Sequence, residues 1–594
     1  MLRGYCQYML AGCLAVVFVC LARPCPADET SSIQLAQLLD DAWQFRLRDD
    51  PLFATRVGDS RYNDQLPEVT VASYQRRLAA QRQFLARLRE IDRRKLTRRE
   101  QISFDIFGRL EADQIAEYEF QTHFMPITNR SGFHVEFAEL NRNVPLNTVR
   151  DYENYIARLR GFKTYALQHI ELMRAGVAAG MVLPAVVLRG YEAPITTHIV
   201  DDPTRSLLYQ PLREFPSGID DADRRRLAAS ACQAITEGLV PGYRDFLQFM
   251  TDEYVPAARG QIGASALPGG REFYRHRVRR FTTLDLTPQE VHDTGMAEVE
   301  RIGREMRALI ERVGFKGDFA AFVEYLRTDP RFYVDDPEQL LKETSYVLKK
   351  ADGKLPSLFG TLPRTPYGVR KIPDFIAPNT TTAYYSEPAG DGTRAGFYYV
   401  NVYDLKSRPL YEIEALSLHE AVPGHHLQIA LQQEQTDLQA FQRFAGFTVF
   451  IEGWALYAER LGLEMGFYTD PYQDFGRLSY EMWRACRLVV DTGIHYLGWT
   501  RQQAIDFMAE HSALTLLNIT NEVDRYIAWP GQALAYKTGE LKIRQLRADA
   551  EARLGARFNV RAFHDVVLGS GAVPLSILEE NVESYIRATE SGGE

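Results

Sequence analysis

The chain has 594 residues, of which 45% are apolar, and this is enough for a large buried core. A formal net charge of −9 argues against nucleic acid as a partner. The length by itself is compatible with more than one domain.

The N-terminus has the pattern of an export signal. Arg3 precedes an apolar stretch, Met9 to Leu21, and cleavage after Ala27 is expected, so residues 1–27 form the predicted signal peptide. Leu10-Ala11-Gly12-Cys13 matches a bacterial lipoprotein box, but the apolar run continues beyond it, whereas such a box should end it. We therefore expect a periplasmic or secreted protein rather than one anchored through Cys13. No later segment approaches 18 consecutive apolar residues, so no membrane span is predicted.

The cysteines say little about function. After cleavage only Cys232 and Cys486 remain, and either one disulfide or two buried free thiols would fit. Because no Cys-x-x-Cys pair occurs, zinc sites built from thiolates are excluded.

The remaining residues, 28–594, predict one large, mainly α-helical catalytic region. Apolar residues recur at helical spacing through 31–125, 148–174 and 221–255. Thr287-Pro288-Gln289-Glu290 is a helix start with a capping box, and this helix should run to about Val313. Within the region we distinguish an N-terminal helical lobe (31–285) from a second lobe (286–594), which contains the cluster of histidines at 419–426 and is the expected metal-binding lobe.

The pattern changes to strands before the metal motif. Thr380 to Tyr385 and Ala395 to Tyr403 are β-branched and aromatic, and the turn residues between them predict a hairpin. The second strand could hold an extended peptide by backbone pairing, with Tyr398 and Asn401 as substrate-binding residues. The alternative is a small structural hairpin.

Three of the twelve histidines fall within Leu418-His419-Glu420-Ala421-Val422-Pro423-Gly424-His425-His426. Neutral imidazoles are zinc ligands, and a Glu directly after the first His is the general base in His-Glu-x-x-His hydrolases. Pro423 occupies the position where that motif would place its second His, and proline interrupts a helix. Gly424 permits unusual backbone angles, so we predict a bulge that re-aims the next His. Either His425 or His426 could then be the second ligand, and the shortened reach favours His425.

Glu452 is the natural third ligand. It lies in an apolar segment, Phe447 to Glu459, where an unpaired carboxylate would be costly to bury. Glu459 is seven residues further on, on the same helix face, and could support a ligand from behind. The alternative is that His419 and His425 are ordinary core histidines and Glu452 is an ion-paired helix residue.

These motifs carry a family resemblance. The runs His-Glu-Ala-Val-Pro-Gly-His-His, Glu-Gly-Trp-Ala-Leu-Tyr-Ala-Glu and Trp-Pro-Gly-Gln-Ala (529–533) resemble the family known as domain of unknown function 885, from about residue 35 to the C-terminus. The resemblance implies a helical, zincin-like metallopeptidase fold of gluzincin type, with Zn²⁺ as cofactor. In gluzincins Gly-His closes the metal motif, which implies His425 rather than His426 as ligand.

Further candidates lie downstream. An apolar helix carries charged or polar residues every three or four positions: Arg484, Arg487, Asp491 and His495. We interpret them chiefly as a structural ion-pair network. The alternative is that His495, oriented by Asp491, is a transition-state donor. A phenol can stabilise the oxyanion of hydrolysis, so Tyr526 and Tyr536 are candidate catalytic residues. Arg525 or Lys537 could bind a substrate carboxylate.

Together these features predict an exported zinc hydrolase that cleaves peptide bonds in short peptides, with Glu420 as general base. A zinc amidase or esterase acting on a non-peptide substrate is the first alternative. The second is a peptide-binding protein with a degenerate, metal-free site. The sequence does not indicate an oligomeric state.

Overall fold

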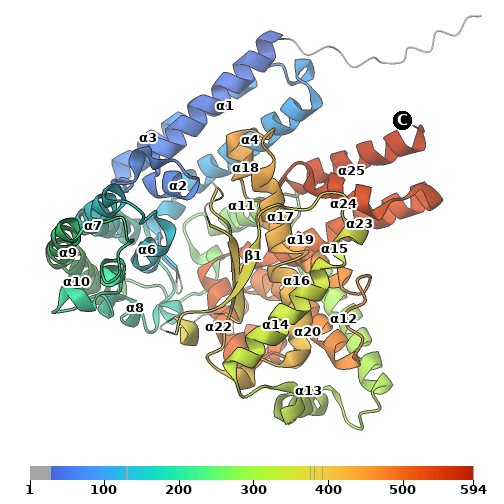
Figure 1. Ribbon diagram of the computed structural model, residues 1–594. Helices are drawn as coiled ribbons and strands as arrows, with labels where there is room; N and C mark the ends of the chain where they lie inside the picture. The colour runs from blue at the N-terminus through green and yellow to red at the C-terminus, as the bar shows by residue number, and fades with distance from the viewer. Residues whose placement is uncertain are drawn as a thin grey trace, which may run out of the picture.

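The computed structural model describes residues 29–128, 131–374, 376–379, 381–390, 392 and 394–592. The predicted signal peptide, with Cys13, lies outside these residues. The described chain is mainly helical with one small sheet, which confirms the prediction of a mainly helical protein with a small β element (Figure 1). Cys232 and Cys486 are both free thiols. Within the described ranges, no helix combines the length and the apolar character needed to cross a membrane.

The first half of the chain is built from helices, drawn in blue to green in Figure 1. They are α1 (Glu29–Asp49), α2 (Pro51–Arg56), α3 (Val71–Arg89), α4 (Arg98–Glu119), α5 (Phe133–Glu136), α6 (Leu140–Asn143), α7 (Val149–Ala179), α8 (Ala193–Thr196), α9 (Asp221–Ala234), α10 (Val240–Phe249) and α11 (Gly270–Thr282). Side-chain caps mark several starts: Thr97 with Glu100, and Thr148 with Asp151, form capping boxes. α1, α3 and α4 pack together, and α7 packs against α9 and α10.

The second half carries the metal motif. Its helices are α12 (Pro288–Arg312), α13 (Phe319–Thr328), α14 (Pro337–Asp352), α15 (Leu355–Leu358), α16 (Ile413–Glu420), α17 (His425–Glu434), α18 (Ala440–Arg443), α19 (Thr448–Leu461), α20 (Pro471–Thr492), α21 (Arg501–His511), α22 (Leu516–Ala528), α23 (Ala535–Leu554), α24 (Val560–Leu568) and α25 (Leu575–Glu590). The capping box predicted at Thr287 and Glu290 is present, and α12 ends one residue before Val313. α12 packs along α20, and α19 along α23.

The sheet has three strands in the order β1–β3–β2. β2 (Ala383–Ser386) and β3 (Gly396–Val400) are the predicted hairpin and pair antiparallel, with Ala383 opposite Val400. β1 (Tyr367–Lys371) adds in parallel on the other side of β3. The strand predicted to bind a peptide is therefore the central one, and its backbone is already paired on both sides. β1 and β2 are the two edge strands.

One hydrophobic core runs through the molecule, with buried side chains from Leu35 in α1 to Ile586 in α25. The helices that carry the metal motif are among its most buried parts, and every side chain from Ile413 to Glu420 in α16 is buried. The motif is thus held on packed helices rather than on a surface loop.

Candidate metal centre

The predicted break in the metal helix is present. α16 ends at Glu420 and α17 begins at His425, so four residues separate the two helices. A side chain at Gly424 would collide with the carbonyl oxygen of His419, which explains the glycine in this turn. The indole Nε1 of Trp454 donates to the carbonyl oxygen of Pro423 at 2.8 Å and ties the turn to α19. Gly424 and the Trp454 hydrogen bond therefore hold the turn that directs the side chain of His425.

Three side chains converge at this turn. Nε2 of His419 lies 3.6 Å from Oε2 of Glu452, and Nε2 of His425 lies 3.5 Å from the same oxygen. One ligand atom from each of the three lies within 4.8 Å of the others. Two ligand atoms about 2.0–2.2 Å from one zinc ion at a tetrahedral angle are about 3.3–3.6 Å apart, so the spacing to the carboxylate fits Zn²⁺.

The hydrogen bonding of the trio also fits a metal. Within the described part of the chain, the buried Oε2 atom of Glu452 has no hydrogen-bond donor. A buried carboxylate oxygen without a donor is costly unless a cation satisfies it. Two histidines and one glutamate are a common set of protein ligands in catalytic zinc sites. The residues present therefore suit a zinc ion with an open fourth position.

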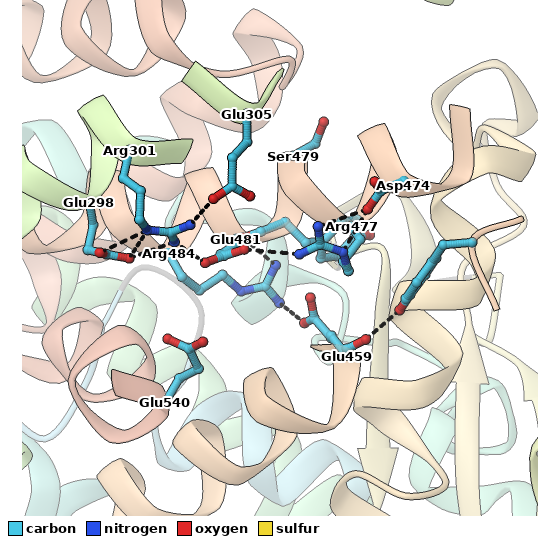
Figure 2. A network of polar contacts seen from close by, with 12 residues as sticks. Glu298, Arg301, Glu305, Glu459, Asp474, Arg477, Ser479, Glu481, Arg484 and Glu540 are labelled. Carbon is cyan, nitrogen blue, oxygen red and sulfur yellow. Dashed lines mark hydrogen bonds and ion pairs between the residues drawn. The ribbon is translucent and has the colours of Figure 1, made fainter. Parts of the chain in front are cut away.

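Glu459 supports His419 from behind. Its Oε1 accepts a hydrogen bond from Nδ1 of His419 at 2.8 Å, which leaves Nε2 free to face Glu452. Burial alone would lower the pKa of His419, but the nearby carboxylates of Glu452 and Glu459 raise this pKa to about 9. Figure 2 shows Glu459 joined in turn to Arg484 of α20, with Nη2 of Arg484 3.7 Å from Oε1.

His426 faces away from the trio. Its Nδ1 is 2.8 Å from the Tyr385 hydroxyl, and its Nε2 is 3.1 Å from the carbonyl oxygen of Thr365. Burial lowers the pKa of His426 to about 4, so the ring is neutral. Both ring nitrogens already have protein partners.

The trio lies in a pocket of about 350 Å³. Glu420 lines this pocket beside His419 and His425. One wall is the edge strand β2 with the residues just before it, and the opposite wall comes from α20 and α22. The lining side chains beyond the trio and Glu420 are Thr381, Thr382, Ala383, Tyr384, Tyr385, Leu416, Ile429, Ile451, Tyr480, Trp483, Arg484, Arg487, Glu522, Arg525 and Tyr536.

Among the downstream candidates, Tyr536 and Arg525 line the pocket, and Tyr526 does not. Tyr526 is 1% exposed, and its hydroxyl accepts hydrogen bonds from Nε1 of Trp483 and Nε of Arg487. It therefore stands behind the wall of the pocket and holds those two side chains in place.

Lys537 and His495 are likewise remote from the pocket. Lys537 is fully buried and forms ion pairs with three glutamates, Glu298, Glu481 and Glu540, so it has no room for a substrate. His495 accepts from the Ala264 N–H through Nδ1 and donates from Nε2 to the carbonyl oxygen of Tyr526. Its role is to hold chain segments together, and it has no contact with the metal trio.

Tyr398 lies on the central strand β3, and Asn401 follows directly after this strand. Both side chains are buried. Burial raises the pKa of Tyr398, whose ring is 1% exposed. The Asn401 amide donates to the carbonyl oxygens of Ala377 and Thr381 and so fixes the segment that leads into β2. Neither side chain lines the pocket, although the nearby Glu420 carboxylate adds to the effect of burial in raising the pKa of Tyr398.

Two pocket residues were interpreted from the sequence only as structural, namely Arg484 and Arg487. They lie one helical turn apart on α20 and bring two guanidinium groups to the pocket wall. Their spacing within an otherwise apolar helix was the available signal. This spacing predicts a charged helix face, but it does not predict which other segment of the chain that face contacts.

A larger cavity of about 960 Å³ lies elsewhere, among α1, α3, α4 and α7. It extends to Phe447 and Thr448 at the start of α19 but contains none of the three converging ligands. Burial raises the pKa of Glu111 in its wall to about 7. The converging histidines and Glu452 line the smaller pocket instead.

The fold and the site define a helical protein with two histidines and a glutamate converging beside a second glutamate. The chain belongs to the family described as "Bacterial protein of unknown function (DUF885)", whose model matches residues 51–582. No curated protein matches it.

Solved structures share the fold. A crystal structure described as "the putative lipoprotein from Colwellia psychrerythraea" is 29% identical, with a TM-score of 0.89, and the match covers 94% of this chain and 99% of that one. A second, described as "a putative lipoprotein of unknown function from Shewanella oneidensis", is 19% identical with a TM-score of 0.66, covering 93% and 99%. The second likeness extends to the fold alone.

Proposed function

We propose that this protein is a zinc-dependent hydrolase, and specifically a metallopeptidase that cleaves short peptides. The observation that carries the proposal is the convergence of His419, His425 and Glu452 in one pocket with Glu420. Three protein ligands with an adjacent free carboxylate are the inventory of a hydrolytic zinc site. A purely structural site would close the fourth position with another protein ligand.

Each residue has a distinct role in this proposal. His419, His425 and Glu452 hold the zinc ion, which supplies Lewis-acid activation of a carbonyl and of water. Glu420 accepts the proton of the attacking water and returns it to the leaving amine. Glu459 fixes the orientation of the His419 ring through its 2.8 Å hydrogen bond. Tyr536 lines the pocket and is the remaining phenol candidate for stabilising the oxyanion.

The position of the sheet favours a peptide as substrate. The edge strand β2 forms a wall of the pocket that contains the trio. An edge strand has one row of backbone groups unpaired and can bind an extended peptide as an additional strand. A zinc amidase or esterase on a non-peptide substrate remains the second candidate, since its chemistry needs the same four residues. Hydrolysis of a peptide panel against an ester panel separates the two.

The test begins with metal content. We expect about one zinc per chain in the purified protein, and its loss in His419→Ala, His425→Ala and Glu452→Ala, because a three-ligand site depends on each ligand. His426→Ala is the matched control and should retain zinc, since its ring is turned towards Tyr385 and Thr365. Zinc loss in the His426 variant together with retention in the His425 variant would contradict the assignment.

Glu420→Gln then separates binding from chemistry. The neutral isostere should keep zinc and the melting temperature of the wild type, while turnover of an active peptide falls by about 10²–10⁴-fold or more. Near-normal turnover would exclude the proposed mechanism even with zinc bound. A wild-type protein without zinc would favour the peptide-binding alternative.

We also propose that the protein is exported. The apolar N-terminal stretch supports this, as does the description of the 29% identical structure as a putative lipoprotein. Mass spectrometry of the mature N-terminus distinguishes cleavage near Ala27 from lipid attachment at Cys13.

A further inference from the structure

We infer that the pocket recognises a peptide carboxylate, through a recess formed by Arg484, Arg487 and Arg525. The inference rests on the proposed function, which it deepens by naming the group that the substrate presents. All three arginines line the pocket that contains the metal trio. Among the described residues that line the pocket, three are acidic: Glu420, Glu452 and Glu522.

The guanidinium groups are buried but incompletely satisfied. The side chains of Arg484 and Arg487 are 5% and 3% exposed. Among the described residues, Nε of Arg484 and Nη1 of Arg487 are buried without a hydrogen-bond acceptor. Buried donors on charged groups normally find partners, because desolvating them otherwise costs free energy. An acceptor supplied by a ligand would satisfy them.

The existing contacts hold the guanidinium groups in place without neutralising them. Nε of Arg487 donates to the Tyr526 hydroxyl at 2.9 Å, and Nη2 donates to Oε2 of Glu522 at 3.1 Å. Nε of Arg525 lies 3.3 Å from the same Glu522 oxygen. Glu522 is thus shared by two arginines, so this end of the pocket retains an excess of positive charge.

Aromatic rings complete the recess. The Arg487 guanidinium carbon lies 4.4 Å from the ring centre of Trp483 and 4.2 Å from that of Tyr536. Packing between two aromatic faces fixes the plane of the guanidinium. A planar guanidinium held in this way is suited to a carboxylate, which can accept two parallel hydrogen bonds.

The recess leads away from the metal trio along α20. Arg484 is joined to Glu459, which is hydrogen-bonded to His419, so Arg484 marks the metal end. Arg487 is three residues further on, about 4.5 Å along the helix axis. A substrate carbonyl at the trio would therefore place a carboxylate one or two residues away against Arg487 and Arg525. The carboxyl terminus of a short peptide and an acidic side chain both supply this group.

The test is the binding of three probes of equal length to zinc-loaded Glu420→Gln protein by calorimetry: Ala-Ala-Ala as the free acid, its C-terminal amide, and Ala-Ala-Asp amide. Hydrogen bonds to charged groups predict that the acid binds about 10- to 100-fold more tightly than Ala-Ala-Ala amide. Tight binding of the aspartate amide identifies a side-chain carboxylate as the group recognised, and weak binding identifies the carboxyl terminus.

Substitution of the recess should abolish the preference. In the same background, Arg487→Gln and, separately, Arg525→Gln should bind the acid and the amide equally, with thermal melting as the check on folding. Arg501→Gln is the control, because Arg501 is paired with Asp524 and lies outside the pocket lining. A preference that survives both substitutions, or equal binding of all three probes to the parent protein, would overturn the inference.

Failure of the carboxylate inference and failure of the proposed peptidase function give different results. Selective binding of a carboxylate by a protein that hydrolyses none of the peptides would end the proposed function and leave the recess intact. Equal wild-type rates on the acid and on both amides would keep the peptidase and end the carboxylate inference.

Discussion

At the scale of single residues, Glu459 links the metal trio to the rest of the protein. It is 1% exposed, and it accepts the Nδ1 hydrogen of His419 while facing Arg484. A carboxylate behind a ligating histidine fixes its tautomer and raises its basicity as a ligand. The charge of Glu459, and not only its shape, should therefore contribute to metal affinity.

Glu459→Gln tests this contribution. The amide oxygen can still accept from His419, but the negative charge is lost, so we expect zinc affinity to fall about 10- to 100-fold. Competition with a fluorescent zinc chelator measures the change. Glu464→Gln is the control and should leave zinc affinity unaltered, because Glu464 is partly exposed and pairs with Arg547. Equal affinities in the two variants would mean that Glu459 has only a packing role.

At the scale of elements, the position of Glu452 depends on the close contact of α19 with α23. A side chain at Gly453 would collide with the backbone of Gly539, and one at Gly539 would collide with the carbonyl oxygen of Val449. The two helices thus touch backbone to backbone, immediately beside Glu452. The run Glu452-Gly453-Trp454 consequently combines the carboxylate proposed to bind zinc, a helix contact and the indole that donates to the Pro423 carbonyl oxygen.

Gly539→Ala should disturb the candidate metal site, although Gly539 does not line the pocket. The added methyl group has no space, and overpacking of this kind costs about 1–3 kcal/mol of stability. Because α19 must shift, Glu452 moves relative to the histidines, and zinc binding should weaken along with a fall in melting temperature. Gly446→Ala is the control, since the nearest atom to its new Cβ would be 3.5 Å away. A destabilised Gly539 variant with unchanged zinc affinity would show that the helix contact does not position the ligand.

At the scale of the whole molecule, a buried ion cluster joins α12, α20 and α23 behind the pocket. Lys537 of α23 forms ion pairs with Glu298 of α12 at 3.0 Å, Glu481 of α20 at 2.8 Å and Glu540 of α23 at 2.9 Å. Figure 2 shows Glu481 also contacting Arg301 and Arg477. Although burial opposes charge on Lys537, the surrounding carboxylates raise its pKa, so it stays a cation.

Lys537→Met should destabilise the protein by about 3–5 kcal/mol, because it leaves buried carboxylates without their shared cation. Chemical denaturation measures the loss. Lys542→Met on the same helix is the control: Lys542 pairs with the half-exposed Glu579, so its removal should cost at most about 1 kcal/mol. Zinc content and KM of the folded Lys537 variant should match the wild type. A raised KM with unchanged stability would indicate instead that Lys537 contacts the substrate.

Several local features of this protein follow from short stretches of its sequence. The helix starts at Thr97, Thr148 and Thr287 are set by side chains within three residues of the cap. The break between His419 and His425 follows from Pro423 and Gly424, which act on adjacent backbone. Family membership was equally predictable, because it rests on contiguous motifs. Such features need no information about distant partners.

Tertiary structure alone decided which polar residues face the pocket. The parallel pairing of β1 with β3 makes β3 the central strand and leaves β2 at an edge, and no pattern within the hairpin reveals a third strand. Arg487 and Lys537 are both buried cations in helices, yet one lines the pocket and the other is enclosed by carboxylates. Periodicity shows that a helix face is buried, but the partner of that face comes from a distant segment. Only the packing of α20 against α12, α22 and α23 separates these roles.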